Sequence, residues 1–376
     1  MKEKAVLIGI LQPSDSLMAL KESLEELKEL SETAGAFILD SIIQRRKEID
    51  PKYFIGKGKV KQIKSIYRGI TLLIFNHELS PTQIRNLEKA LDLKVITRTE
   101  LILDIFAMHA RSNLSRLQVE LAQLLYELPR ITGKGISLSR LGGGIGTRGP
   151  GEQQLELDRR LIKKKILIIK KKLELFDRGR KEQRKSRMGA EFKIAIIGYT
   201  NSGKSTLLRR LTKAAVLVEN KLFATLDTTT RRLWLGINNG RPARAVITDT
   251  VGFIRDIPHG LIESFRSTLQ DTIGADLLIH LIDLSSSGFN EKKEIVNNTL
   301  EEIGASAIPV VVCYNKIDVL PPEKLLEYRL KYPDSIYISA EKNLFIDILI
   351  EKIKGYYNVW KAARHREGQM AELYNP

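Results

Sequence analysis

The segment FKIAIIGYTNSGKSTLLRRL at 192–211 has the residue types and spacing that most clearly indicate a chemical role. Its loop combines two glycines, a lysine and several hydroxyl side chains. An apolar run leads into G-x-x-x-x-G-K-S from Gly198 to Ser205, and an amphipathic helix pattern follows. In such a strand, loop and helix, backbone N–H groups and the helix N-terminus point at phosphate oxygens. Lys204 would neutralise the β and γ phosphates, and the Ser205 hydroxyl would join Mg²⁺. The pattern predicts a nucleoside triphosphate site.

A second motif could select the base. The run VVVCYNKID at 310–318 ends in N-K-x-D, which is Asn315, Lys316, Ile317 and Asp318. The aspartate can accept hydrogen bonds from N1–H and the 2-amino group of guanine, whereas adenine would leave it unpaired at a cost of about 1 to 3 kcal/mol. The Lys316 stem would pack over base and sugar. Ser339 and Ala340 in YISAE resemble the second base-contacting loop of GTPases.

A third motif, D-x-x-G from Asp249 to Gly252, ends the apolar run of AVITDTVGF. Asp249 would hold Mg²⁺ through water, and the Gly252 N–H would sense the γ-phosphate. A GTPase also needs a threonine hydroxyl on the metal, and FATLDTTTRR offers four candidates, Thr225, Thr228, Thr229 and Thr230. We favour Thr225 because FAT resembles the corresponding switch of related translation GTPases.

The residue after Gly252 is Phe253, where many signalling GTPases place a glutamine that orients the attacking water. A phenyl ring cannot polarise water, so we expect slow intrinsic hydrolysis that a partner or an ion must stimulate. Asn201 occupies the position at which several GTPases lacking that glutamine bind K⁺. K⁺ activation is therefore one hypothesis, and the alternative is that Asn201 only caps its own loop.

Composition limits what surrounds these motifs. The chain has 376 residues, enough for two or three domains, and its longest apolar runs are too short to span a membrane. A single cysteine, Cys313, excludes an intramolecular disulfide, and we expect it to be buried. The net charge is +16, and residues 159–187 hold fourteen basic residues against three acids. We therefore expect a cytoplasmic protein with a polyanionic partner.

Residues 1–110 are predicted to form a parallel α/β domain. Apolar runs alternate with helix patterns, namely AVLIGIL, AFILDSII, ITLLIFNH and LKVITR. Ser14 or Asp15 could cap the first helix, and Ser80 with Pro81 opens a later one. FIGKGKV at 54–60 is interpreted as a tight turn, with a phosphate site as the alternative.

Residues 111–187 are predicted to form an antiparallel coiled-coil hairpin. Leucines at 114, 117, 121, 124 and 128 follow an a/d seam, and a second set matches it, namely Leu155, Ile162, Ile166, Ile169, Leu173 and Phe176. Two separate core helices are the alternative. The glycine-rich loop at 133–151 has G-x-G-x-x-G spacing but no strand before it, so it is not a dinucleotide turn. We interpret it as a hairpin tip with a set of candidate RNA-binding cations, Arg140, Arg148, Arg159 and Arg160.

Residues 188–356 are predicted to form a P-loop GTPase domain with a doubly wound sheet, followed by a C-terminal tail at 357–376, a short helix and then disorder. The three nucleotide motifs, together with GGGIGTRGPGEQQLELDRR, resemble the HflX family of ribosome-associated GTPases. FIGKGKV, ELSPTQIRNLEKAL, TELILDIFA, LQVELAQLLYELPR and FATLD carry the resemblance over most of the chain.

The resemblance implies a GTP site that includes both switches. Its expected GTP-binding residues are Gly198, Tyr199, Thr200, Asn201, Ser202, Gly203, Lys204, Ser205, Thr206, Phe223, Ala224, Thr225, Leu226, Asp227, Asp249, Thr250, Val251, Gly252, Asn315, Lys316, Ile317, Asp318, Ser339 and Ala340. Lys204, Asp249 and Gly252 are the expected catalytic residues, and Ser205 and Thr225 the expected Mg²⁺ ligands.

The resemblance also implies binding to the large ribosomal subunit and its rRNA, with separation of stalled ribosomes into subunits under GTP control. We expect a monomer. One rival is a GTPase of another RNA process, such as tRNA modification, which should show a catalytic cysteine or a cofactor motif. Another is a P-loop kinase or an ATP-driven RNA remodeller, and a third is a scaffold with a vestigial site.

Overall fold

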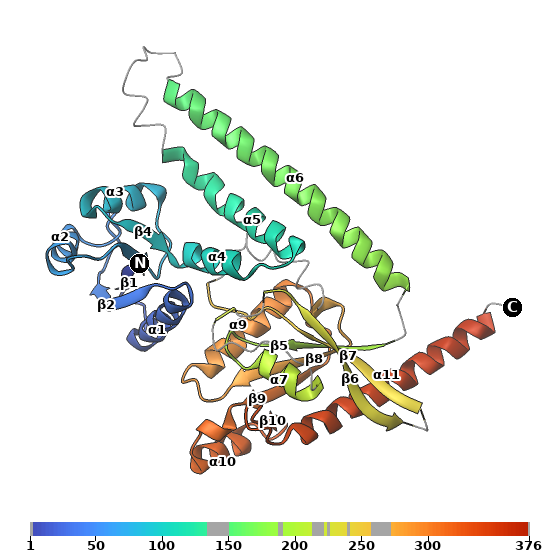
Figure 1. Cartoon of the computed structure of the whole chain (residues 1–376). Helices are drawn as coiled ribbons and strands as arrows, with labels where there is room; N and C mark the ends of the chain where they lie inside the picture. The colour runs from blue at the N-terminus through green and yellow to red at the C-terminus, as the bar shows by residue number, and fades with distance from the viewer. Residues whose placement is uncertain are drawn as a thin grey trace. The chain divides into compact units, whose positions relative to one another are not determined.

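The computed structural model describes residues 3–133, 150–186, 191–212, 222–223, 226–238, 241–256 and 272–374. The chain divides into two compact units whose main boundary lies after Phe176 (Figure 1). The nucleotide motifs all belong to the second unit.

The first unit contains a four-stranded parallel sheet in the order β2-β1-β3-β4. Its strands are β1 (Lys4–Leu11), β2 (Phe37–Arg45), β3 (Leu72–Phe75) and β4 (Lys94–Thr97). Its helices in this part of the chain are α1 (Leu17–Thr33), α2 (Lys57–Ile66), α3 (Pro81–Leu91) and α4 (Arg98–His109). The four predicted strands and the parallel α/β domain are therefore confirmed.

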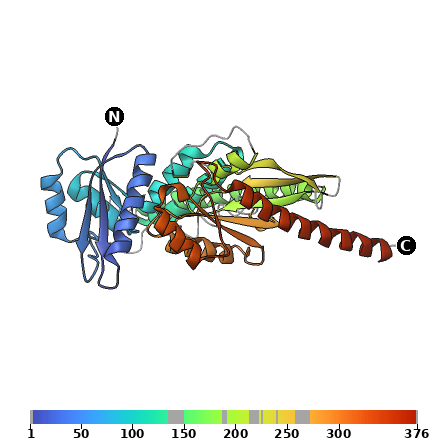
Figure 2. The same cartoon turned by 90° about the horizontal axis from the view of Figure 1, so that it is seen from below.

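Helices cover both faces of this sheet, as the two views show (Figures 1 and 2). On one face, Leu20 and Leu24 of α1 lie so close to Gly9 that an added Cβ would meet the two side chains at 3.2 and 3.0 Å. On the other face, α2 and α3 contribute Ile63 and Leu87 to a cluster with strand residues. The sequence alternation of strands and helices encodes this three-layer packing.

Helix starts in this unit follow local chemistry. Ser80 accepts a hydrogen bond from the Gln83 N–H and the Gln83 side chain returns one to the Ser80 backbone, a capping box beside Pro81. The cap of α1 is Ser16 instead of the expected Ser14 or Asp15, because the Asp15 carboxylate instead accepts from the Gln12 N–H at 2.8 Å.

The predicted tight turn at FIGKGKV contains Phe54 with a φ of 66°, and Gly56 then caps α2. A positive φ is typical of a turn residue. The segment therefore reverses the chain and starts a helix, as the turn interpretation requires.

Helices α5 (Asn113–Glu127) and α6 (Pro150–Ser186) form the predicted hairpin and run side by side in opposite directions, with the short 3₁₀ helix η1 (Leu128–Gly133) after α5 (Figure 1). Leu121 and Leu124 pack with Ile166 and Ile169 along the seam. The heptad prediction is confirmed in this central part. Helix α6 is about 55 Å long and α5 about 22 Å, so the seam does not cover all of α6, and Phe176 is 42% exposed.

The second unit contains a six-stranded sheet in the order β10-β9-β8-β5-β7-β6, parallel except for β6 at its edge. Its strands are β5 (Phe192–Ile197), β6 (Thr229–Asn238), β7 (Arg241–Asp249), β8 (Leu277–Asp283), β9 (Val310–Asn315) and β10 (Ile336–Tyr337). Its described helices are α7 (Lys204–Thr212), α9 (Phe289–Glu302), the 3₁₀ helix η3 (Ile317–Val319), α10 (Pro322–Lys331) and α11 (Ile346–Tyr374).

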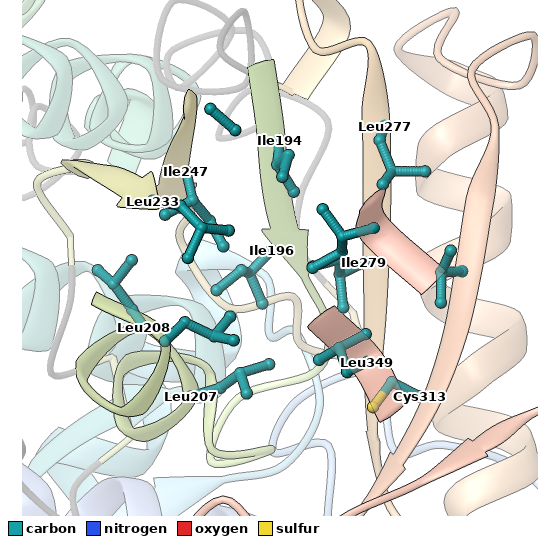
Figure 3. Packing of buried hydrophobic residues seen from close by; sticks show 14 of the residues in the cluster. Ile194, Ile196, Leu207, Leu208, Leu233, Ile247, Leu277, Ile279, Cys313 and Leu349 are labelled. Atoms are coloured by element: carbon teal, nitrogen blue, oxygen red, sulfur yellow. The ribbon is translucent and has the colours of Figure 1, made fainter. Parts of the chain in front are cut away.

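Alternate residues of each strand face opposite sides of this sheet. On one side, Ile279 and Cys313 pack with Leu207 of α7 and Leu349 of α11 (Figure 3). On the other, Tyr314 packs with residues of α9 and η3. This period of two is that of a strand buried on both faces. The doubly wound arrangement is therefore confirmed, and Cys313 is buried as expected.

The last helix continues through the boundary that the sequence suggested at 356–357. Tyr357 and Trp360 of α11 pack against Phe192 at ring-centroid distances of 5.8 and 5.4 Å, the first edge-to-face and the second tilted. The first part of the expected tail thus belongs to the core of the second unit. Within the described ranges, no helix is both long and apolar enough to cross a membrane.

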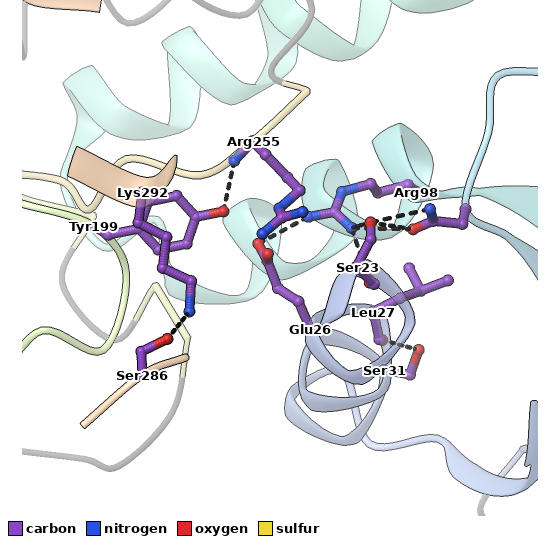
Figure 4. Close-up of polar contacts among 10 residues, drawn as sticks. Ser23, Glu26, Leu27, Ser31, Arg98, Tyr199, Arg255, Ser286 and Lys292 are labelled. Carbon is purple, nitrogen blue, oxygen red and sulfur yellow. Dashed lines mark hydrogen bonds and ion pairs between the residues drawn. The ribbon is translucent and has the colours of Figure 1, made fainter. Parts of the chain in front are cut away.

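The carboxyl edge of the first sheet, where parallel sheets often bind ligands, holds a buried polar cluster instead. Arg98, directly after β4, donates to Glu26 at 2.8 Å and to Asn76 at 3.1 Å (Figure 4). Ser23 exchanges hydrogen bonds with the same Asn76 side chain. Arg98 is 2% exposed, so its charge depends on these partners.

The hairpin seam predicts a position-dependent loss of stability. Ile166→Ala should lower the free energy of unfolding of the hairpin by about 2 to 4 kcal/mol, because Ile166 is 8% exposed within the seam. Leu167→Ala, one residue along and 61% exposed, should change it by less than about 0.5 kcal/mol. Urea unfolding and amide hydrogen exchange of α5 and α6 measure both, and equal effects would contradict the paired-helix packing.

Candidate nucleotide site

Five parallel strands of the second unit end at one edge of its sheet, and four of them, all but β8, end at or lead into a residue of the three motifs or of the loop after β10. Ligands bind at this edge in open α/β sheets because the loops after the strands converge there. The P-loop follows β5, Asp249 ends β7, Asp283 ends β8, Asn315 ends β9, and Ser339 lies just after β10. The fold therefore brings the predicted phosphate, metal and base residues together.

Two glycines fix the path of the P-loop. An added Cβ on Gly198 would lie 2.2 Å from the Leu281 carbonyl oxygen, and one on Gly203 would lie 2.4 Å from the Asn315 side-chain nitrogen. Gly203 has a φ of +94° and Asn201 a φ of 60°. The loop thus requires left-handed backbone, and its glycines also permit its close approach to β8 and β9.

Lys204 begins α7 and turns its ammonium into the loop. Nζ donates to the carbonyl oxygens of Tyr199 at 2.8 Å and Gly198 at 3.2 Å, and the residue is 7% exposed. Burial lowers the pKa of Lys204 to about 8, and the nearby Asp249 carboxylate opposes that effect. A buried cation at this position would attract phosphate strongly.

Ser205 and Asp249 form the candidate metal end of the site. The Ser205 hydroxyl donates to Asp249 Oδ2 at 2.6 Å, and Asp249 is fully buried. Within the described residues, no group of three or more His, Cys, Asp or Glu side chains could hold a metal ion. Hydroxyl and carboxylate oxygens suit Mg²⁺, which usually takes only one or two protein ligands and completes its shell with phosphates and water. The residues present therefore fit Mg²⁺.

The segment after Asp249 is tied to the P-loop through its backbone. Phe253 N–H donates to the Gly198 carbonyl at 3.1 Å, and the Phe253 carbonyl accepts from the Thr200 N–H at 2.8 Å. The Arg255 N–H donates to the Tyr199 hydroxyl at 2.8 Å (Figure 4). Gly252 lies against Lys204, because an added Cβ would be 3.0 Å from Nζ. Phe253 is 3% exposed, so its ring is enclosed by protein.

The base end is held by the side chain of Asn315. Its Nδ2 donates to the Ser202 carbonyl at 2.8 Å, and its Oδ1 accepts from the Ala340 N–H at 2.9 Å. The same side chain therefore joins the P-loop to the loop after β10. Ser339, fully buried, accepts from the Lys342 N–H at 3.0 Å.

Lys316 and Asp318 complete the base-binding motif. Lys316 has a φ of 64°, and its ammonium pairs with Asp283 at 2.7 Å. Asp318 lies in η3 with its side chain exposed. An exposed carboxylate three residues after Asn315 could accept from a guanine edge.

Several predicted residues are not placed at the site. Ala224, Thr225, Arg140 and Arg148 lie outside the described residues. Of the other threonine candidates, Thr229 and Thr230 lie in β6, where the Thr230 hydroxyl is 3.0 Å from that of Thr248. The remaining switch residues, Phe223, Leu226 and Asp227, are buried or half-buried.

The hairpin cations that are described lie on the outside of α6. Arg159 is exposed, and Arg160 is 70% exposed with a 2.7 Å pair to Glu156. A pair this exposed leaves Arg160 close to solvent and able to exchange partners.

Two functional contacts were missed by the sequence reasoning. Asp283 was not singled out by the sequence analysis, although its place at the end of the apolar run LLIHLID could have drawn attention to it. Arg210 of α7 donates from Nε to the Ala340 carbonyl at 3.0 Å and so supports the base loop. It carried no recognisable signal in the sequence.

Two further titratable groups in the core of the second unit, His280 and Cys313, offer no base or nucleophile. Burial lowers the pKa of His280 to about 3 and raises the pKa of the Cys313 thiol. His280 is therefore neutral and Cys313 protonated near pH 7. Both are core residues, and for Cys313 this burial is the expected one.

The P-loop geometry predicts that Gly203→Ala weakens guanine nucleotide binding at least tenfold and lowers the free energy of unfolding by about 1 to 3 kcal/mol. The new methyl group would collide with the Asn315 amide and require a left-handed alanine. Gly355→Ala in α11 is the matched control, since nothing lies within 4 Å of its added Cβ, and it should stabilise the protein by roughly 0.5 to 1 kcal/mol. Fluorescent GDP titration and urea unfolding test both.

The buried ammonium predicts a pH dependence of stability. Below pH 8 Lys204 is protonated in folded and unfolded chains alike, so folding carries the full cost of burying the charge. Between pH 8 and its ordinary pKa of 10.5, the unfolded chain binds more protons, and the stability contributed by Lys204 rises with pH. The free energy of unfolding of Lys204→Met, taken relative to that of the wild type, should therefore fall by about 1 to 3 kcal/mol as the pH rises from 7 to 10.

Urea unfolding at several pH values without nucleotide measures this difference. Lys331→Met, at an exposed position, should show no such change with pH. Parallel curves for Lys204→Met and wild type would show that the Lys204 charge is not buried.

Comparisons with known proteins agree with this geometry. Three family models match in succession: the GTP-binding GTPase N-terminal domain at residues 21–107, the GTP-binding GTPase middle region at 109–187, and a 50S ribosome-binding GTPase domain at 193–316. Together they include the hairpin, the P-loop, the D-x-x-G segment and the first two residues of N-K-x-D, Asn315 and Lys316.

Curated relatives match nearly the whole chain. GTPase HflX of Caldanaerobacter subterraneus subsp. tengcongensis is 48% identical over 94% of this chain and 80% of its own length. GTPase HflX of Escherichia coli is 42% identical over 93% of this chain and 82% of its own length.

Among solved structures, a GTP-binding protein from the archaeon Sulfolobus solfataricus in complex with GDP is 28% identical, with a TM-score of 0.50, over 95% of this chain and 99% of that chain. A structure titled as the complex of SsGBP and GDP gives a TM-score of 0.54 at the same identity and coverage. With a P-loop, a D-x-x-G segment and an N-K-x-D motif assembled at one sheet edge, and with these relatives, the chain belongs to the HflX family of GTPases and is a GTP-hydrolysing enzyme.

Proposed function

We propose that this GTPase binds the large ribosomal subunit and separates or rescues stalled ribosomes under the control of GTP. The observation that carries the nucleotide part is the Asn315 amide, which joins Ser202 of the P-loop to Ala340 of the base loop. A site whose phosphate and base loops are joined by one side chain suits GTP better than a phosphate alone. The ribosomal part is supported by the family and by the charge of α6.

The phosphate end assigns a role to each residue. Lys204 would neutralise the β and γ phosphates, Ser205 and Thr225 would be the protein ligands of Mg²⁺, and Asp249 would hold the ion through water. Mg²⁺ supplies positive charge that stabilises the transferring phosphoryl group. Gly252 lies against Lys204, and its N–H would report the presence of the γ-phosphate.

Hydrolysis is proposed to be slow until the ribosome is bound. The D-x-x-G segment is followed by Phe253, which is buried and carries no group that can orient water. The missing group would come from the ribosome or from an ion. K⁺ at Asn201 is one such ion, and equal turnover in Na⁺ and K⁺ buffers would remove that part of the proposal.

The RNA-binding surface is proposed to be the outer side of α6. Ile166 and Ile169 face the seam, and seven cations on other sides of the helix are exposed, namely Arg159, Arg160, Lys163, Lys164, Lys165, Lys171 and Lys172. A row of cations outside an apolar seam leaves the charges available for phosphates. Arg140 and Arg148 of the tip loop are proposed to extend the same surface.

This GTP-controlled cycle uses two states. GTP with Mg²⁺ orders the switches and favours the ribosome-bound form, and hydrolysis releases it. We propose that the protein acts as a cytoplasmic monomer that is partly ribosome-associated. The rival with tRNA-modifying chemistry would need a reactive cysteine, and Cys313 is buried with a raised pKa. An ATP-driven remodeller would bind ATP as tightly as GTP.

Replacing Lys163, Lys164 and Lys171 together by glutamine tests the RNA surface. The variant should bind large subunits more weakly in the presence of a GTP analogue, because three phosphate contacts are lost. The slope of log affinity against log salt should fall by about 2 to 3. Co-sedimentation between 50 and 200 mM salt measures it, with GDP and no nucleotide as comparison states.

The matched control replaces Lys324, Lys331 and Lys352, three exposed lysines of the second unit, by glutamine. It makes the same change in net charge and should keep the wild-type slope. Unchanged binding by the α6 variant would count against this surface, and ATP displacing GTP at similar concentration would favour the ATP-driven rival.

A further inference from the structure

Asp283 ends β8 directly beside the base-binding motif. In the parallel pairing of β8 with β9, Asp283 is in register with Asn315, so the two side chains start from the same edge of the sheet. Lys316 follows Asn315 directly and is the first residue after β9. No motif of the sequence analysis includes Asp283.

Both oxygens of the Asp283 carboxylate are engaged. Oδ2 pairs with the Lys316 ammonium at 2.7 Å, and Oδ1 accepts from the Ser285 N–H at 3.0 Å and from the Ser285 hydroxyl at 2.6 Å. The Lys316 and Asp283 side chains are 29% and 21% exposed. Ser285 thus holds the Asp283 carboxylate through Oδ1, and the carboxylate can hold the Lys316 ammonium through Oδ2.

The lysine needs such a restraint. Its side chain has four rotatable bonds and would lose much freedom if it had to order when nucleotide binds. Its backbone is also left-handed, which Lys316 shares with few non-glycine residues of the chain. An ion pair that already holds the side chain removes part of that entropic cost from binding.

We propose that Asp283 is a positioning residue for the guanine site, one that holds Lys316 in place to cover the base and sugar. This inference rests on the proposed function, in which Asn315, Lys316 and Asp318 bind guanine. Asp283 does not touch the nucleotide. It acts only through Lys316, and its contribution therefore disappears when Lys316 is removed.

A double-mutant cycle tests this dependence. Wild type, Asp283→Ala, Lys316→Ala and the double variant are compared by titration with fluorescent GDP and by its dissociation rate in stopped flow. Asp283→Ala should weaken GDP binding roughly tenfold, mainly through faster dissociation. In the Lys316→Ala background, the same change should have an effect of less than about twofold.

Milder variants keep the test valid if Asp283→Ala folds poorly. Asp283→Asn keeps an acceptor for Ser285 but loses the charge, and should weaken GDP binding by about three- to fivefold. Asp334→Asn, an exposed carboxylate of the same unit, is the matched control and should bind GDP like wild type. Thermal unfolding of each variant separates a local effect from a loss of fold.

The outcomes separate the inference from the function beneath it. The positioning role would be overturned if Asp283→Asn bound GDP with wild-type affinity. It would also be overturned if Asp283→Ala reduced GDP affinity by the same factor in the wild-type and Lys316→Ala backgrounds. Failure of the wild type to prefer GDP over ADP would instead overturn the guanine site itself. If Lys316→Ala binds GDP like wild type while that preference remains, the guanine site stands and the role of Asp283 falls.

Discussion

The nucleotide site depends first on one buried side-chain amide. Asn315 donates to Ser202 and accepts from Ala340, so its two ends hold the phosphate loop and the base loop at a fixed spacing. A planar amide can make both bonds only if the three segments keep one arrangement, and an unpaired buried amide would be costly. The close packing of Gly203 against the same side chain explains why that position tolerates no Cβ. The parallel sheet supplies the rest, because its strands end together at this edge.

The same site holds a buried charge that lowers the free energy of unfolding of the empty protein. Lys204 is buried with a pKa lowered to about 8, so the empty fold carries a cation that water would solvate better. In the proposed site, nucleotide phosphates would provide the missing counter-charge, and a ligand that binds only the folded state stabilises it by mass action. Binding affinity and fold stability are therefore linked through one side chain. The Asp249 carboxylate reduces the cost without removing it, since it also bonds to Ser205.

Sequence patterns predicted what depends on periodicity and fixed spacing. The four strands of the first sheet, the Ser80 cap and the Ile166 seam all follow from local rules and are confirmed. The patterns could not predict contacts between irregular segments: the Phe253 backbone bonds involve no particular side chain, and the Asp283 pair joins residues 33 positions apart. The sequence analysis also assigned Tyr357 and Trp360 to a tail, although they belong to α11. Their packing on Phe192 joins residues far apart in the sequence, so no local pattern predicts it. Whether Thr225 binds the metal stays a prediction.

The local structure around Phe253 is consistent with the absence of a water-orienting glutamine at this position. Both backbone polar groups of this residue bond to the P-loop, on either side of Tyr199, and the Tyr199 hydroxyl accepts from Arg255 two residues further on. A residue held in this way contributes its ring to packing, and a glutamine there would leave a polar group in an enclosed position. The start of the second switch is therefore shaped for attachment to the phosphate loop and not for orienting water. Hydrolysis still requires an oriented water, so the group that orients it comes from outside this segment, in line with the proposal that a partner or an ion completes the site.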